Sequence, residues 1–136
     1  MVRKLELLVK HYDSDLCIHF EETGLKFLWF TFKWMNCFLM REFSLSSVIR
    51  MWDTYFSEEK DGFEEFHVYV CAAILRKFSS KLKAMEFESL FEYIQVSLFH
   101  TFMSRHFKRK FLILYFRCLN RICQRFNGVK LRLTCY

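Results

Sequence analysis

The sequence contains no proline and only three glycines among its 136 residues. Both residue types interrupt helices and build tight turns, so their scarcity argues against a loop-rich all-β fold and favours long helices. The sequence also lacks the mainly polar composition of disordered chains, because 53% of its residues are apolar and 20% are aromatic. Such a composition argues against disorder, and a chain of this length has room for at most one domain. We therefore expect an all-α unit, or a piece of one.

Signals of export and of common chemistries are missing as well. The N-terminal stretch MVRKLELLVKHYD has no uninterrupted apolar region, and the run 111–116 is far shorter than the roughly 20 residues that span a bilayer. The cysteines are therefore expected to be reduced thiols in a cytosolic protein. A glycine-rich phosphate loop and a G-x-S-x-G sequence do not occur, so neither nucleotide binding nor a hydrolase triad is predicted.

One pair of residues has metal-ligand spacing. His67 and Cys71 stand four apart in a segment with helical periodicity, which can place two ligands side by side. A structural zinc site needs four ligands, however, and no C-x-x-C pair accompanies these two residues. Buried, neutral thiols are the favoured interpretation of the cysteines, and no metal or cofactor is expected.

Acidic residues disappear after position 96. Residues 97–136 hold nine Lys and Arg and no acid, whereas residues 1–96 hold 12 basic and 15 acidic residues. We therefore divide the chain into a domain piece, 1–96, and a divergent basic tail, 97–136, that is either amphipathic and helical or disordered. Arg117, Arg121 and Arg125 are four apart, which suits an anionic membrane surface. RNA is a weaker alternative, so no nucleic-acid partner is expected; a translated extension unrelated to the domain fits equally well.

The apolar periodicity predicts a succession of helices. Two short helices precede Gly24, with Asp13 or Ser14 capping the second, and residues 25–41 are apolar on nearly every face, as in a fully buried helix. A helix capped by Ser44 or Ser46 ends at the polar loop 57–62. Two further helices are expected, over residues 63–81 and around 87–94. In the fourth helix the apolar stripe is Val48, Ile49, Trp52, Tyr55 and Phe56; the residues expected in the core include Trp34, Met40, Trp52 and Phe66.

The stretch FTFKWMNCFLMREFSLSSVIRMWDTYFSEE, Phe30 to Glu59, closely resembles the F-x-F-R-W-x-N-x-L-L-x-R-E…R-x-W-D-x-Y stretch of TBC domains. The resemblance continues through residues 63–95, which look like the Golgi-associated subgroup, and it covers about two thirds of the chain. It implies an all-α fold, the C-terminal helical part of a TBC domain truncated on its N-terminal side. It also implies membership of the Rab GTPase-activating proteins, which are regulators and not themselves enzymes, with a Rab GTPase as partner.

The resemblance also implies where the chemistry lies. TBC domains supply an Arg from an I-x-x-D-x-x-R motif and a Gln from a Y-x-Q motif to the active site of the GTPase, and both motifs precede the region matched here. The first motif does not occur in this sequence. The one Y-x-Q, Tyr93-Ile94-Gln95, stands at the family's later F-L-Q position and is interpreted as a chance match. No catalytic residue is therefore predicted, and the isolated chain is expected to be inactive; the alternative is a non-catalytic Rab- or membrane-binding fragment.

Polar residues within the matched apolar helices are the candidate site. Lys33 stands where the family usually has Arg, which keeps the charge but loses the planar donor fork, so we expect a weakened ion-pair or hydrogen-bond network there. Buried polar groups need partners, so internal ion-pair or capping networks, or a Rab-facing groove, are predicted for the rest of this set. The set consists of Lys33, Asn36, Arg41, Glu42, Arg50 and Asp53. A cytoplasmic location, peripheral at Golgi or other endomembranes, is expected from the resemblance.

Overall fold

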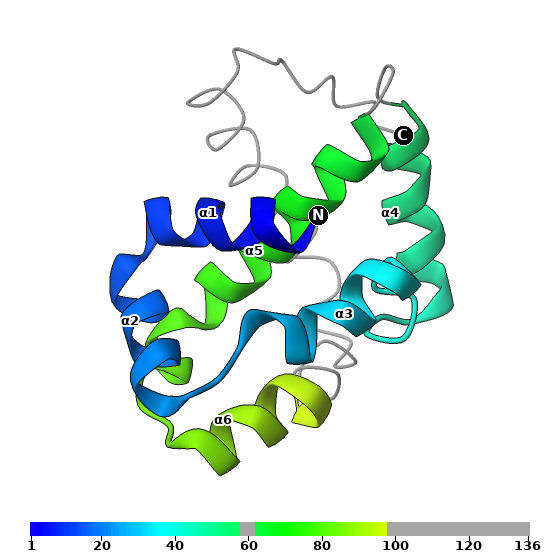
Figure 1. Ribbon diagram of the computed structural model, residues 1–136. Helices are drawn as coiled ribbons and strands as arrows, with labels where there is room; N and C mark the ends of the chain where they lie inside the picture. The colour runs from blue at the N-terminus through cyan, green and yellow to red at the C-terminus, as the bar shows by residue number, and fades with distance from the viewer. Residues whose placement is uncertain (58–61, 98–136) are drawn as a thin grey trace.

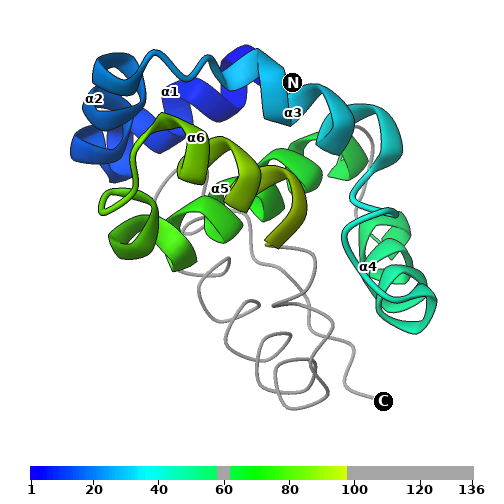
Figure 2. The same cartoon turned by 90° about the horizontal axis from the view of Figure 1, so that it is seen from below.

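The computed structural model describes residues 1–57 and 62–97, and every regular element in these ranges is helical. This confirms the predicted all-α class. The long helix α5 runs through the middle of the molecule, and α2 and α4 lie at opposite ends (Figures 1 and 2). No helix in the described ranges is long and apolar enough to cross a membrane. The helices are α1 (Val2–Tyr12), α2 (Ser14–Thr23), α3 (Phe27–Cys37), α4 (Leu45–Ser57), α5 (Gly62–Leu82) and α6 (Phe87–Glu92), followed by the π-helical turn η1 (Tyr93–Ser97).

The corner between α1 and α2 is built as the sequence predicts. Asp13 caps α2, because its carboxylate accepts a hydrogen bond from the Leu16 amide at 3.1 Å. The same carboxylate accepts hydrogen bonds from Ser79 and from Lys83, both near the end of α5. Burial raises the pKa of Asp13, but the hydrogen bonds from Ser79, Lys83 and Leu16 together bring it below the ordinary value. Gly24 ends α2 with a φ of 77°, a conformation that favours glycine.

The third helix is shorter and less enclosed than predicted. It ends at Cys37, because Phe38 and Leu39 turn the chain with φ values of 45° and 60°. This turn buries Leu39 completely and directs Met40 outward, so that Met40 is 50% exposed and its assignment to the core was wrong. Leu28, Trp29 and Phe32 are also exposed, so α3 is buried along one face rather than on all sides.

In α4 the helix boundaries agree with the prediction, but the apolar stripe does not. The main-chain oxygen of Ser44 accepts from the amides of Ser47 and Val48, which starts the helix at Leu45. Since successive turns advance by 3.6 residues, Val48, Met51 and Tyr55 share one buried side of α4, and Tyr55 on that side packs against Phe63 and Phe66 of α5. Ile49 and Phe56 lie on the solvent side, and Trp52 is half-buried.

Aromatic side chains fill the core between α2, α3 and α5. The ring of Phe20 lies 5.4 Å from that of Phe27 and 5.9 Å from that of Phe30, and Phe30 lies 5.4 Å from Trp34, all edge to face. Such pairs contribute about 0.5–1.5 kcal/mol each beyond the area that they bury. Trp34 and Phe66 are buried, which confirms those two core assignments. The ring pairs therefore hold α3 against α2, and the contact of His67 on α5 with the main-chain oxygen of Trp34 joins α3 to α5.

Candidate functional site

Lys33 and Glu42 form the ion pair at the centre of the matched stretch. Their charged atoms, Lys33 Nζ and Glu42 Oε1, are 2.7 Å apart, and Glu42 is only 4% exposed. Glu42 lies in the connection between α3 and α4, where its amide donates to the main-chain oxygen of Leu39. Since a buried carboxylate is costly without a partner, the ammonium of Lys33 is what makes this position of Glu42 tolerable.

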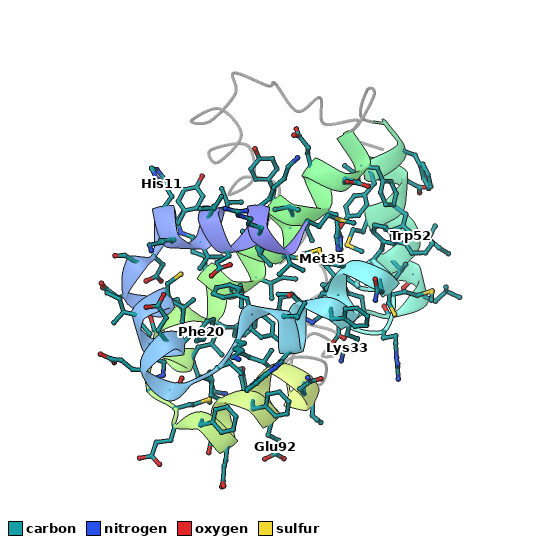
Figure 3. All side chains as sticks on the ribbon, viewed as in Figure 1. His11, Phe20, Lys33, Met35, Trp52 and Glu92 are labelled. Carbon is teal, nitrogen blue, oxygen red and sulfur yellow. The ribbon has the colours of Figure 1, made fainter. Side chains whose placement is uncertain are left out.

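The same ammonium reaches a third segment of the chain. Lys33 Nζ donates to the main-chain oxygen of Gln95 at 3.3 Å, in η1. Figure 3 shows Lys33 on the side of α3 that faces the end of α6. The side-chain amide of Gln95 donates in turn to the main-chain oxygen of Trp29 at 3.3 Å. Gln95 therefore bonds to α3 through its own amide group, and Lys33 ties α3, the 38–44 connection and η1 together.

The other members of the predicted set lie at the surface. Asn36, Arg41, Arg50 and Asp53 are all exposed, so within the described ranges the internal network consists of Lys33, Glu42 and Gln95. The exposed four remain predictions for a Rab-facing groove. Arg117, Arg121 and Arg125, predicted for membrane binding, lie outside the described residues.

A second polar cluster joins three helices, and sequence reasoning considered its His67 only as a possible metal ligand. His67 of α5 is fully buried, with Nε2 at 3.0 Å from the main-chain oxygen of Trp34 and Nδ1 at 3.1 Å from the hydroxyl of Tyr55. A carbonyl oxygen only accepts, so Nε2 carries the proton and Nδ1 accepts from Tyr55. Burial lowers the pKa of His67 to about 4, although the bond to Trp34 acts in the opposite direction. The imidazole is therefore neutral.

The sequence contains a signal that could have suggested the contact of His67 with Tyr55, although no such pair was predicted. Tyr55 lies two residues before the end of α4 and His67 five residues after the start of α5. Two helices joined by a short polar loop pack against each other as antiparallel neighbours, which brings residues on either side of the loop together. A histidine and a tyrosine on the apolar sides of such helices are therefore a candidate hydrogen-bonded pair.

Two buried thiols, Cys71 beside His67 and Cys17 on α2, are poor nucleophiles and poor ligands. Cys71 Sγ lies 3.7 Å from Nε2 of His67, and burial raises the pKa of the Cys71 thiol well above its ordinary value. Burial likewise raises the pKa of Cys17 to about 11. Within the described ranges no three His, Cys, Asp or Glu side chains are grouped so as to hold a metal ion. The pair His67 and Cys71 thus belongs to the packing of the core.

Both clusters use polar side chains to bond main-chain groups of neighbouring helices. Lys33 and Gln95 bond to oxygens of η1 and α3, and His67 bonds to an oxygen of α3. The fold and the site therefore define an all-helical scaffold protein. Its buried polar side chains hold its own helices together.

Comparison with known proteins assigns the family. The model of the Rab-GTPase-TBC domain matches residues 1–83, and the chain belongs to this family. It is 51% identical over 94 residues to the GTPase-activating protein gyp1 of Schizosaccharomyces pombe, with 69% of the chain and 18% of that protein covered. It is 43% identical over 95 residues to the human TBC1 domain family member 22A, again with 69% of the chain and 18% of the relative covered.

A solved structure supports the same assignment. The crystal structure of the Ypt/Rab-GAP domain of Gyp1p superposes with a TM-score of 0.65 at 50% sequence identity. The match covers 69% of this chain and 29% of that domain. The chain therefore has the fold of part of a Rab-GAP domain, and it spans less than a third of the relatives that it matches.

Substitutions of Lys33 test the central ion pair. Lys33→Met is expected to lower the free energy of unfolding by about 2 kcal/mol, because it leaves Glu42 buried without its cation. Lys33→Arg, which introduces the family's usual residue, should be at least as stable as the parent, because it keeps the charge and regains the planar donor fork. Urea unfolding followed by circular dichroism measures both. The matched control is Lys10→Met on the exposed side of α1; equal effects of Lys33→Met and Lys10→Met would contradict a structural ion pair.

Proposed function

We propose that this chain is a supporting part of a Rab GTPase-activating domain and does not itself accelerate GTP hydrolysis. The observation that carries the proposal is how the polar groups of the matched stretch are used. Lys33 is paired with Glu42, and Gln95, the only glutamine in a Y-x-Q sequence, donates to the Trp29 carbonyl. These side chains hold the chain's own helices in place rather than extending from the surface toward a partner.

The sequence supports the same conclusion. An activating protein of this family supplies an arginine and a glutamine to the GTPase, and the arginine alone accelerates hydrolysis by roughly 10³–10⁵-fold. The I-x-x-D-x-x-R sequence that would carry the arginine does not occur among the 136 residues. The matched stretch does contain two exposed arginines, Arg41 and Arg50. Both come after the W-M-N sequence, whereas the family's arginine motif precedes the matched region.

Single-turnover hydrolysis tests the proposal. Each member of a panel of Rab proteins is loaded with GTP and mixed with the purified 136-residue chain, and phosphate release is followed. We expect rates within about twofold of the intrinsic rate, because no arginine is delivered to the transferring phosphoryl group. The S. pombe relative serves as the positive control. Acceleration of any Rab well beyond the buffer control would show that the chain contains its own catalytic residues.

The same Rab panel separates the alternative, a non-catalytic binding module. Fluorescence anisotropy of a labelled Rab measures binding independently of hydrolysis. Saturable binding without acceleration would favour the binding module, with Asn36, Arg41, Arg50 and Asp53 as candidate contacts. A peripheral location at Golgi or other endomembranes would be consistent with such a partner. Co-sedimentation with anionic liposomes tests the membrane role predicted for the basic residues after position 97.

A further inference from the structure

An exposed apolar face lies across α3 and α6. Leu28 and Phe32 are one helical turn apart on α3 and are 56% and 62% exposed, and Trp29 beside them is 45% exposed. The ring of Trp29 lies 6.2 Å from that of Phe87 and 6.5 Å from that of Phe91 on α6. We call these five side chains, of which Phe91 is half-buried, the α3–α6 face, because the ring contacts of Trp29 join the α3 residues to Phe87 and Phe91. Contiguous apolar surface of this kind marks an interaction site.

The rim of the α3–α6 face is acidic. Glu86, Glu88 and Glu92 are exposed on and beside α6, and Figure 3 shows Glu92 pointing away from the molecule. Two cations lie close: Lys26 is over the Trp29 ring at 5.8 Å, and Lys33 is already paired with Glu42. Two copies of this face would bring like charges together, and an anionic membrane would be repelled by it. The face therefore suits a basic partner that also carries apolar side chains.

The last described residues of the chain, in η1, lie beside the α3–α6 face. Two hydrogen bonds join Gln95 to α3. Its side-chain amide donates to the main-chain oxygen of Trp29, and its main-chain oxygen accepts from Lys33. Ser97, two residues later, is the last described residue. The C-terminal segment 98–136 is thus attached next to Trp29. Because the segment is covalently attached, its binding to the α3–α6 face would be intramolecular. The high effective concentration strengthens such binding without any additional contact.

The C-terminal segment has the composition that the face requires. Residues 98–136 contain nine Lys and Arg, no Asp or Glu, and the apolar run FLILYF at 111–116. We propose that this basic segment docks in cis on the α3–α6 face, with its apolar side chains on Trp29, Phe32 and Phe87 and its cations beside Glu88 and Glu92. The segment then covers apolar surface that would otherwise promote association between molecules.

Photocrosslinking in the full chain tests the placement. Phe32 is replaced by p-benzoylphenylalanine, and the matched control carries the same residue in place of Leu7 on α1, because both positions are 62% exposed. After irradiation, mass spectrometry identifies the crosslinked peptides. We expect crosslinks from position 32 to residues 98–136 of the same molecule, well above the yield from position 7. Equal yields at the two positions, or crosslinks between two copies, would overturn the proposal.

Charge reversal tests the acidic rim. The double variant Glu88→Lys, Glu92→Lys is made in the chain that carries the crosslinker at position 32. It should lower the yield of intramolecular crosslinks by about threefold. The chain without these two substitutions should lose yield similarly in about 1 M salt. The control variant reverses Glu21 and Glu22 on α2, which are equally acidic and exposed. Unchanged yield in the Glu88 and Glu92 variant, or an equal loss in the control, would contradict charge-assisted docking on this face.

Discussion

Replacing His67 with alanine is expected to lower the free energy of unfolding by about 3–4 kcal/mol. His67 is fully buried, so the substitution leaves a cavity among α3, α4 and α5. It also leaves the hydroxyl of Tyr55 and the main-chain oxygen of Trp34 without their partner, and an unsatisfied buried polar group costs about 1–3 kcal/mol. Equilibrium unfolding in urea measures the change.

Two further variants separate the contributions. Tyr55→Phe removes only the hydroxyl and is expected to cost about 1–2 kcal/mol, because Nδ1 of His67 loses its donor while the cavity is not formed. Lys77→Ala, on the exposed side of α5, controls for changes to that helix and should stay within about 0.5 kcal/mol. If His67→Ala were as mild as Lys77→Ala, the three-helix cluster would not be holding the fold together.

Acidification from pH 7 to pH 4 is expected to remove about 3 kcal/mol of stability through His67 alone, as an order of magnitude. Burial lowers the pKa of His67 from 6.5 to about 4 in the folded chain. Between these two values the unfolded chain binds a proton that the folded chain does not, so unfolding is favoured as the pH falls. The stability is fully present above pH 6.5 and its loss is complete below about pH 4.

Unfolding free energies measured between about pH 4.5 and 7 test this dependence. Asp13 also makes the folded chain less stable on acidification, because its pKa is lowered on folding. This loss occurs as the pH falls through the folded pKa, below the ordinary 3.8, and therefore outside this pH range. His67→Gln should flatten the profile because it removes the titrating group, whereas His11→Gln on the exposed side of α1 should retain the slope. Identical slopes in the two variants would show that another group dominates.

Local signals in the sequence were sufficient for most of the helices and for several of their ends. Asp13 caps α2 and Gly24 ends it, because capping and a positive φ depend on residues within one turn. The family resemblance likewise rested on a gap-free stretch, Phe30 to Glu59, and the match of the Rab-GTPase-TBC domain to residues 1–83 confirms it.

The direction of exposed apolar side chains was harder to predict. Met40, Ile49 and Phe56 are apolar, yet they face solvent. Periodicity gives the separation of residues around a helix but does not say which side meets a neighbour, and α4 carries apolar residues on both sides. The left-handed turn at Phe38 and Leu39, which rotates Met40 outward, has no glycine to signal it.

The sequence by itself determined the all-α class, the order of the helices, the family, and the contrast between a nearly balanced first part and a basic extension, because each depends on composition or on neighbours along the chain. Only the tertiary structure decided which polar residues are partners. Lys33 pairs with Glu42 in the next connection and with Gln95 in η1, and His67 bonds to residues on two other helices. The contacts of Lys33 with Gln95 and of His67 with Trp34 join segments far apart in the chain, and all of these contacts depend on how the helices pack against one another.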